Sequence, residues 1–237
     1  MKILGIESSG LVASVAVTED GIVIGEYTTN FKKTHSQTLL PMLDALKKMI
    51  DLDMESIDAI AVSGGPGSFT GLRIGSATAK GLGFALDKPL ISVPTVEALA
   101  YNLWGAATDI CPLMDARRNQ TYTGIYRFEE GEMKEILPQC AVDLGEIIDT
   151  INQNGKPVTF LGDGVPVFQQ QIAEKCKVPY IFAPAHMNRQ NAAALCARAE
   201  EYYRQGRMET AAEHRPDYLR LSQAERERLE QQKKQKV

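Results

Sequence analysis

Two acidic residues that end short apolar runs could hold a metal–phosphate complex. Glu7 ends the run Lys2–Glu7, and Asp115 ends the run Ile110–Asp115. Carboxylate oxygens are ligands that Mg²⁺ takes beside substrate phosphates. If the two halves of the chain are related by a pseudo-twofold axis, both carboxylates face one cleft. The alternative interpretation is that both make only turn and cap hydrogen bonds.

A glycine-rich stretch at residues 63–75 is the strongest local pattern, with five of the 19 glycines. It follows a predicted strand and opens a predicted helix, a setting in which backbone N–H groups can cradle a phosphate. It lacks the Gly-Lys-Ser/Thr ending of a Walker A loop, and its glycines do not fit the GxGxxG spacing. A tight turn with close packing is the alternative. The candidate phosphate or nucleotide site comprises Glu7, Ser8, Gly65, Gly67, Ser68 and Asp115.

A stripe of small residues recurs every four positions along the predicted helix Thr70–Leu86, at Gly71, Gly75, Ala79 and Gly83. Each glycine costs a helix interior about 0.5–1 kcal/mol relative to alanine, which is tolerable where another backbone comes very close. That backbone belongs either to the protein's own sheet or to a second chain.

We expect that the close backbone belongs to a second chain. We also expect the predicted helix Ser36–Ile50 to contribute to this contact between chains. Two helices from each of two chains would then pack together. The predicted partner-interface residues are Leu39, Met42, Leu43, Leu46, Gly71, Leu72, Gly75, Ala79, Leu82 and Gly83.

Each half of the chain predicts a three-stranded antiparallel meander followed by alternating helices and strands, which indicates a duplicated α/β fold. The predicted strands are Lys2–Glu7, Val12–Thr18, Ile22–Thr29, Ala59–Ser63, Leu90–Val93, Ile110–Asp115, Thr121–Arg127, Met133–Leu137 and Val158–Gly162. Further predicted helices are Thr95–Trp104, Leu144–Asn152, Pro166–Cys176 and Gln190–Tyr203. A single α+β domain with two hairpins is the alternative. We predict domains at residues 1–104 and 105–215, and an exposed tail at 216–237 that is partly helical at Gln223–Gln232.

Composition excludes several classes of protein. The chain has 237 residues and a net charge of −4, which argues against binding nucleic acid by bulk positive charge alone. No run of about 18 apolar residues predicts a membrane span. The four cysteines and three histidines are widely spaced, so we predict reduced thiols, no metal site and a cytoplasmic location.

Five strings, in this order, carry a family resemblance. They resemble the TsaB (YeaZ) family of bacterial tRNA threonylcarbamoyladenosine biosynthesis proteins, and the resemblance runs from Lys2 to about Arg228. The strings are Ile3-Leu4-Gly5-Ile6-Glu7-Ser8-Ser9, His35-Ser36-Gln37-Thr38-Leu39-Leu40-Pro41, Gly65-Pro66-Gly67-Ser68-Phe69-Thr70-Gly71-Leu72-Arg73-Ile74-Gly75, Asp115-Ala116-Arg117 and Tyr218-Leu219-Arg220.

The resemblance implies two tandem ribonuclease-H-like domains of the actin/Hsp70/sugar-kinase superfamily. It also implies a scaffold subunit that pairs directly with the catalytic paralogue TsaD, works with the ATPase TsaE through the complex, and meets tRNA through the complex. A homodimer would form when TsaD is absent. ATP and a metal ion are expected in the partner subunits, and no cofactor or catalytic residue in this chain.

The paralogue's metal chemistry does not carry over to this sequence. TsaD has an HxxxH motif where this chain has Thr95 and Leu99, with Glu97 between them. Threonine and leucine cannot replace imidazole as metal ligands. Glu7 stands where many superfamily members have aspartate, so a nucleotide site here would be vestigial. A stand-alone small-molecule kinase or ATPase of the same superfamily is the alternative function, and a metallopeptidase is disfavoured by the missing histidine pair.

Overall fold

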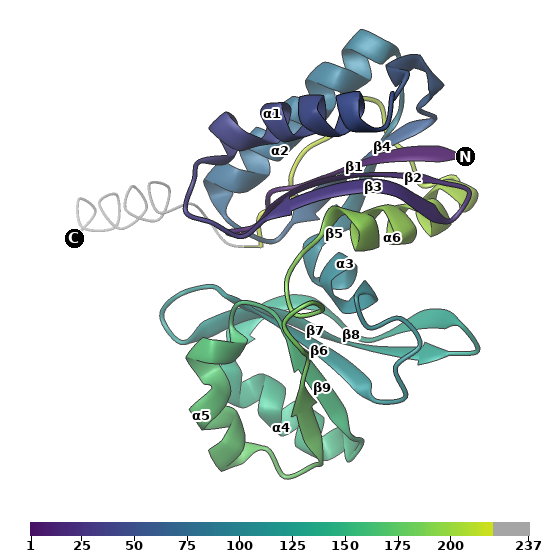
Figure 1. The fold of residues 1–237 in the computed structure, drawn as a ribbon. Coiled ribbons are helices and arrows are strands. Elements are labelled where there is room, and N and C mark those ends of the chain that lie inside the picture. Colours follow the sequence, from purple (N-terminus) through teal and green to yellow (C-terminus); the bar gives the residue numbers. More distant parts are fainter. Residues whose placement is uncertain (220–237) are drawn as a thin grey trace, which may run out of the picture.

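The first sheet has five strands in the order β3-β2-β1-β4-β5. The computed structural model describes residues 1–219 (Figure 1). The antiparallel meander places β2 between β1 and β3, and β4 and β5 then add in parallel. Both faces of β1 are buried, so its residues are almost continuously apolar. The strands are β1 (Lys2–Glu7), β2 (Ala13–Glu19), β3 (Ile22–Thr29), β4 (Ala59–Gly65) and β5 (Leu90–Pro94).

Helices cover both faces of this sheet (Figure 1). On one face, α1 (His35–Met49) and α2 (Phe69–Leu86) lie side by side and bury a core that includes Leu4 and Ile60. A short 3₁₀ turn, Met54–Ser56, connects α1 to β4. On the other face lies α6 (Ala192–Arg204), whose small residues approach the sheet closely.

The second sheet repeats the first, with the order β8-β7-β6-β9-β10. The three-stranded meander again comes first, and two parallel strands follow it. Helices α4 (Leu144–Asn154) and α5 (Val165–Lys175) cover its outer face. The duplication predicted from the pattern of strands is therefore confirmed by topology. The strands are β6 (Asp109–Asp115), β7 (Gln120–Glu129), β8 (Glu132–Asp143), β9 (Val158–Leu161) and β10 (Tyr180–Phe182).

Helices α3 (Thr95–Tyr101) and α6 lie between the two sheets (Figure 1). One face of α3 packs on the second sheet through Leu99, while α6 packs on the first sheet. All strands of the first sheet precede residue 104, but α6 returns to it from the second half of the sequence. The division into domains at 1–104 and 105–215 stays a prediction.

The segment after α6 runs back over the first sheet. Glu209 pairs with Leu90 at the edge of β5, and the Asp217 N–H donates to the Gly64 carbonyl at 2.6 Å. The start of the predicted tail, at residues 216–219, thus contacts the body of the protein. The tail helix predicted at residues 223–232 lies outside the described residues. No helix in the described part is long and apolar enough to cross a membrane.

Candidate functional site

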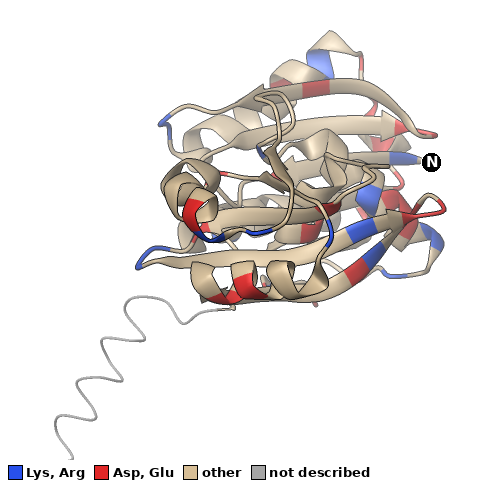
Figure 2. Cartoon of the chain, turned by 90° about the horizontal axis from the view of Figure 1, so that it is seen from below, with Lys and Arg blue, Asp and Glu red and all other residues tan. Residues whose placement is uncertain are grey.

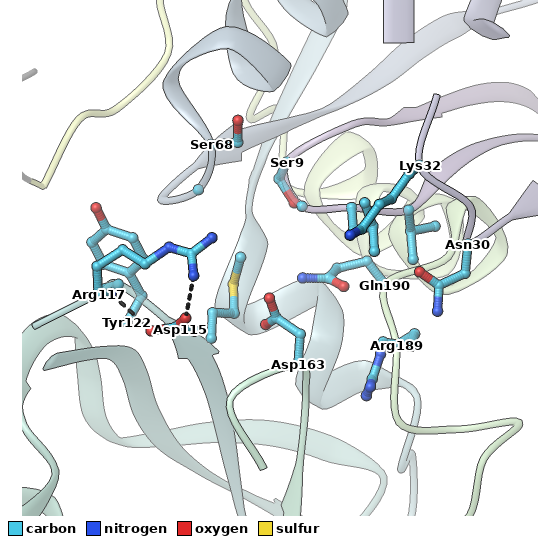
Figure 3. A pocket seen from close by; sticks show the side chains of 16 residues that line it. Ser9, Asn30, Lys32, Ser68, Asp115, Arg117, Tyr122, Asp163, Arg189 and Gln190 are labelled. Atoms are coloured by element: carbon cyan, nitrogen blue, oxygen red, sulfur yellow. Dashed lines mark hydrogen bonds and ion pairs between the residues drawn. The ribbon is translucent and has the colours of Figure 1, made fainter. Parts of the chain in front are cut away.

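A cleft of about 680 Å³ opens between the two sheets, at the ends of the strands that carry the predicted carboxylates (Figure 3). It is lined from the first half by the β1–β2 turn, the β3–α1 loop and the glycine-rich loop, and from the second half by the ends of β6 and β9. The lining residues are Ser9, Gly10, Leu11, Val12, Asn30, Lys32, Gly67, Ser68, Met114, Asp115, Ala116, Arg117, Tyr122, Asp163, Arg189 and Gln190.

The glycine-rich loop packs tightly against the protein's own backbone. A Cβ atom at Gly65 would lie 2.2 Å from the Asp217 carbonyl oxygen, and one at Gly67 would lie 2.3 Å from that of Ser9. The Ser68 N–H also donates to the Ser9 carbonyl, at 2.6 Å. Carbonyl oxygens therefore occupy positions that a phosphate cradle would leave open. Close packing, the alternative interpretation of this loop, explains these glycines.

Glu7 does not reach the cleft. Its side chain is buried and accepts hydrogen bonds from the Ser9 backbone at 2.6 Å, from the Ser9 hydroxyl and from the Ser63 hydroxyl. Burial raises the pKa of the Glu7 carboxyl above its ordinary value. The expectation that Glu7 and Asp115 both face one cleft is thus corrected. The Glu7 carboxylate is buried beneath the cleft, where it accepts hydrogen bonds from Ser9 of the β1–β2 turn.

Three of the six predicted phosphate-site residues line the cleft, namely Gly67, Ser68 and Asp115. The other three are buried beneath it. Besides Glu7, these are Gly65 and Ser8, whose hydroxyl donates to the Gly71 carbonyl at 2.9 Å.

Asp115 is already engaged by its neighbour. It accepts a hydrogen bond from the Arg117 N–H at 2.8 Å and forms an ion pair with the Arg117 guanidinium at 3.1 Å (Figure 3). Within residues 1–219, no group of three or more histidine, cysteine or acidic side chains is placed to hold a metal ion.

The structure adds three cleft residues that the sequence did not single out. Asp163 lies two residues after the end of β9, much as Asp115 is the last residue of β6, and one oxygen of the Asp163 carboxylate is buried without a hydrogen-bond partner. Burial raises the pKa of Asp163, while the nearby Arg189 lowers it. Gln190 is buried and the Nε2 of its amide has no partner. The apolar strand predicted at Val158–Gly162, directly before Asp163, was the available signal.

The predicted partner-interface residues lie mostly inside the protein. On α1, Leu39, Met42, Leu43 and Leu46 pack into the core beneath the helix. On α2, Gly71, Leu72, Gly75, Ala79 and Gly83 are buried, and Leu82 is half-buried against the same core. A Cβ at Gly71 would lie 2.1 Å from the Ser8 carbonyl oxygen, and one at Gly83 would lie 3.1 Å from Ala211 Cβ.

The expectation that the small-residue stripe meets a second chain is therefore corrected. The stripe faces Ser8, strand β4 and the segment after α6, which come too close for larger side chains. The opposite face of α2 is the exposed one, and it includes Arg73, Ala77 and Gly81.

Comparisons with known proteins find a family model described as TsaD and relatives named TsaB. Residues 23–228 match the family model described as TsaD: tRNA N6-adenosine threonylcarbamoyltransferase. The chain is 34% identical to the tRNA threonylcarbamoyladenosine biosynthesis protein TsaB of Bacillus subtilis (strain 168), over 98% of this chain and 100% of that one.

Solved structures with a similar fold include members of the same family. YeaZ from Pseudomonas aeruginosa superposes with a TM-score of 0.79 at 25% identity, covering 92% of this chain and 99% of that one. The polyphosphate/ATP-glucomannokinase of an Arthrobacter species superposes with a TM-score of 0.50 at 9% identity, covering 86% and 99%, and shows the fold alone. The predicted fold class, the tandem ribonuclease-H-like α/β fold of the actin/Hsp70/sugar-kinase type, is thus confirmed. With its full-length likeness to TsaB and the doubled sheet that it shares with YeaZ, the chain belongs to the TsaB (YeaZ) family of tRNA threonylcarbamoyladenosine biosynthesis proteins.

Proposed function

We propose that this chain is a non-catalytic scaffold or activator subunit of the complex that forms N6-threonylcarbamoyladenosine next to the anticodon of ANN-decoding tRNAs. It dimerises with TsaD, which supplies the catalytic site, and TsaE joins through the complex. ATP and the metal ion belong to those partner subunits. The full-length likeness to the Bacillus subtilis TsaB supports this assignment.

The observation that carries the proposal is the environment of α3. Thr95 and Leu99 stand where the catalytic paralogue has its histidine pair, and both are fully buried. Leu99 packs against Ile110 and Tyr126 of the second sheet. Glu97, between them, forms an ion pair with Arg198. In this chain the helix joins the two halves of the molecule instead of presenting ligands to the cleft.

The alternative of a stand-alone kinase or ATPase receives less support from the cleft. Such an enzyme needs carboxylates free to hold a metal–phosphate complex. Glu7 is buried under Ser9 and Ser63, and Asp115 is paired with Arg117.

The exposed face of α1 and α2 is the proposed contact with TsaD, and with a second copy of this chain when TsaD is absent. Leu40 and Met49 of α1 are 56% and 74% exposed, and Phe84 of α2 is 64% exposed. Such large apolar side chains gain most from burial at an interface. Ala77 and Gly81 are also exposed on α2, and their small size leaves room for a partner helix to approach.

A substitution at Gly81 tests this contact. A Cβ at Gly81 meets no atom of the protein within 4 Å, so Gly81→Leu should leave the fold intact. Overpacking the partner contact costs about 1–3 kcal/mol, which weakens TsaD binding about 5–150-fold. Titration calorimetry with TsaD measures this loss, and circular dichroism checks the fold.

The control is Gln153→Leu, at an exposed position of α4 in the second half. It should bind TsaD with unchanged affinity. Unchanged binding by Gly81→Leu would contradict the proposed contact. Failure of the unsubstituted chain to bind TsaD would contradict the proposed function itself.

A further inference from the structure

The mouth of the cleft gathers positive charges from both halves of the molecule. Lys32 lines it from the β3–α1 loop, Arg117 from the β6–β7 turn and Arg189 from the loop before α6 (Figure 3). Lys33 and Arg118 follow the first two in sequence and are exposed. Within residues 1–219, the side-chain charges of Lys32, Lys33 and Arg118 make no hydrogen bond and no ion pair.

Acidic groups offset only part of this charge. The cleft lining holds two carboxylates, and Arg117 already pairs with one of them, Asp115. The other, Asp163, is half-buried, and the charge of Arg189 acts on it. Lysine and arginine also mark loop tips on the left side of the molecule in Figure 2, where the β3–α1 loop and the β6–β7 turn lie in Figure 1. On a chain of net charge −4, this is a local basic site.

The β6–β7 turn holds its arginines in an unusual backbone conformation. Arg117, Arg118 and Asn119 have φ angles of 66°, 57° and 60°, in the left-handed region. Asparagine adopts this region readily, whereas it costs each arginine about 1–2 kcal/mol. The Asn119 side chain fixes the turn by donating to Asp143 at 2.7 Å and accepting from Gln171 at 3.1 Å. The turn thus presents two adjacent arginines in a defined conformation.

The floor of the cleft offers an unsatisfied donor. Gln190 is 3% exposed, and its Nε2 is buried without an acceptor. Figure 3 shows its side chain directed into the pocket, between Asp163 and Lys32. It lies against Gly10, where a Cβ would come within 3.2 Å of the same Nε2. A buried amide donor without a partner is uncommon, and an incoming acceptor oxygen would satisfy it.

We propose that this cleft binds the phosphate backbone of RNA directly, with Gln190 donating to a phosphate oxygen and with Lys32, Arg117 and Arg118 neutralising adjacent phosphates. The unpaired cations continue past the cavity onto the outer surface of both halves, which suits a chain of phosphates better than one free nucleotide. The identity of the RNA, a substrate tRNA, rests on the proposed function. The basic site itself does not.

Fluorescence anisotropy of a labelled anticodon stem–loop of an ANN-decoding tRNA, titrated with the full chain at several salt concentrations, tests this. The double variant Lys32→Glu with Arg118→Glu removes two cations that have no partner in the described structure. It should weaken RNA binding about tenfold and reduce the salt-dependence slope by about 1.4, since each phosphate contact on a single strand contributes about 0.7.

The matched control is Lys156→Glu with Lys177→Glu, which makes the same change in net charge at exposed sites of the second half. It should bind the stem–loop within twofold of the unsubstituted chain. Gln190→Glu, checked for an unchanged thermal midpoint, should also weaken binding, because a carboxylate repels the phosphate.

Three outcomes would overturn the inference: no RNA binding by the unsubstituted chain, equal losses in both double variants, or displacement of the stem–loop by equimolar ATP. Inorganic phosphate serves as a further competitor and should not displace the RNA at that concentration. TsaD binding by the Lys32→Glu, Arg118→Glu variant, measured in parallel, should be unchanged. Failure of RNA binding therefore stays distinguishable from failure of the proposed function.

Discussion

At the scale of single residues, the carboxyl of Glu7 is buried under the hydroxyls of Ser9 and Ser63. Its pKa is raised above the ordinary value of 4.5, so between these two values the folded state binds more protons than the unfolded state. The free energy of unfolding therefore falls as the pH rises through that window. Glutamine keeps an acceptor oxygen at this position and does not titrate.

We predict that Glu7→Gln gains stability relative to the unsubstituted chain as the pH rises from 4.5 through the raised pKa. Urea unfolding of both proteins across this range measures the difference. If the free energies of unfolding of the two proteins changed in parallel with pH, Glu7 would titrate alike in the folded and unfolded states, which would contradict the prediction.

The same residues show what a sequence can say of a site. Asp115 was predictable because it ends an apolar strand, and it does line the cleft. Glu7 also ends an apolar strand, but its side chain points away from the cleft. The direction of such a side chain depends on the turn that follows the strand, which the strand pattern does not predict. No sequence pattern marks Gln190 as a site residue. Its amide lacks a hydrogen-bond partner only because of the tertiary contact that forms where α6 returns to the first sheet.

At the scale of elements, the sequence predicts α2 but not which of its faces is buried. The buried stripe with Gly71 and the exposed face with Ala77 and Gly81 both carry small residues, so hydrophobic periodicity does not tell which of the two is buried. The structure chooses by backbone distance, because Gly71 meets a backbone oxygen and Gly81 meets open space. By contrast, β10 was missed because its three residues are too few to show a pattern.

A pair of alanine substitutions tests this choice. Gly71→Ala should lower the free energy of unfolding by about 1–3 kcal/mol, because its Cβ would lie 2.1 Å from the Ser8 oxygen. Gly81→Ala should raise it by about 0.5–1 kcal/mol, as expected for an open helix interior. Urea unfolding of the two variants measures both values, and effects of the same sign would contradict the assigned faces.

At the scale of the whole molecule, one polar network ties together the two helices that lie between the sheets. Arg198 of α6 pairs with Glu97 of α3, and the side chains of the two are 11% and 8% exposed. The Tyr202 hydroxyl donates to the same carboxylate at 2.7 Å. Removing one partner of a buried ion pair leaves the other charge uncompensated, at a cost of about 3–5 kcal/mol.

Arg198→Met should therefore lower the free energy of unfolding by about 3 kcal/mol. The control is Arg204→Met on the same helix, whose arginine is 69% exposed and pairs with Glu200. It should change stability by less than about 1 kcal/mol. Differential scanning calorimetry of thermal unfolding measures the change in stability of each variant. Equal effects in the two variants would mean that the buried network does not stabilise the junction between the sheets.

The most direct test of the central claim is threonylcarbamoyl transfer to an ANN-decoding tRNA, measured with TsaD and TsaE, with and without this chain. A scaffold subunit should show no transfer alone and should be required for transfer by the others, and Gly81→Leu should lower that transfer in proportion to its lost TsaD binding. Transfer by this chain alone, or full transfer by TsaD and TsaE without it, would contradict the account.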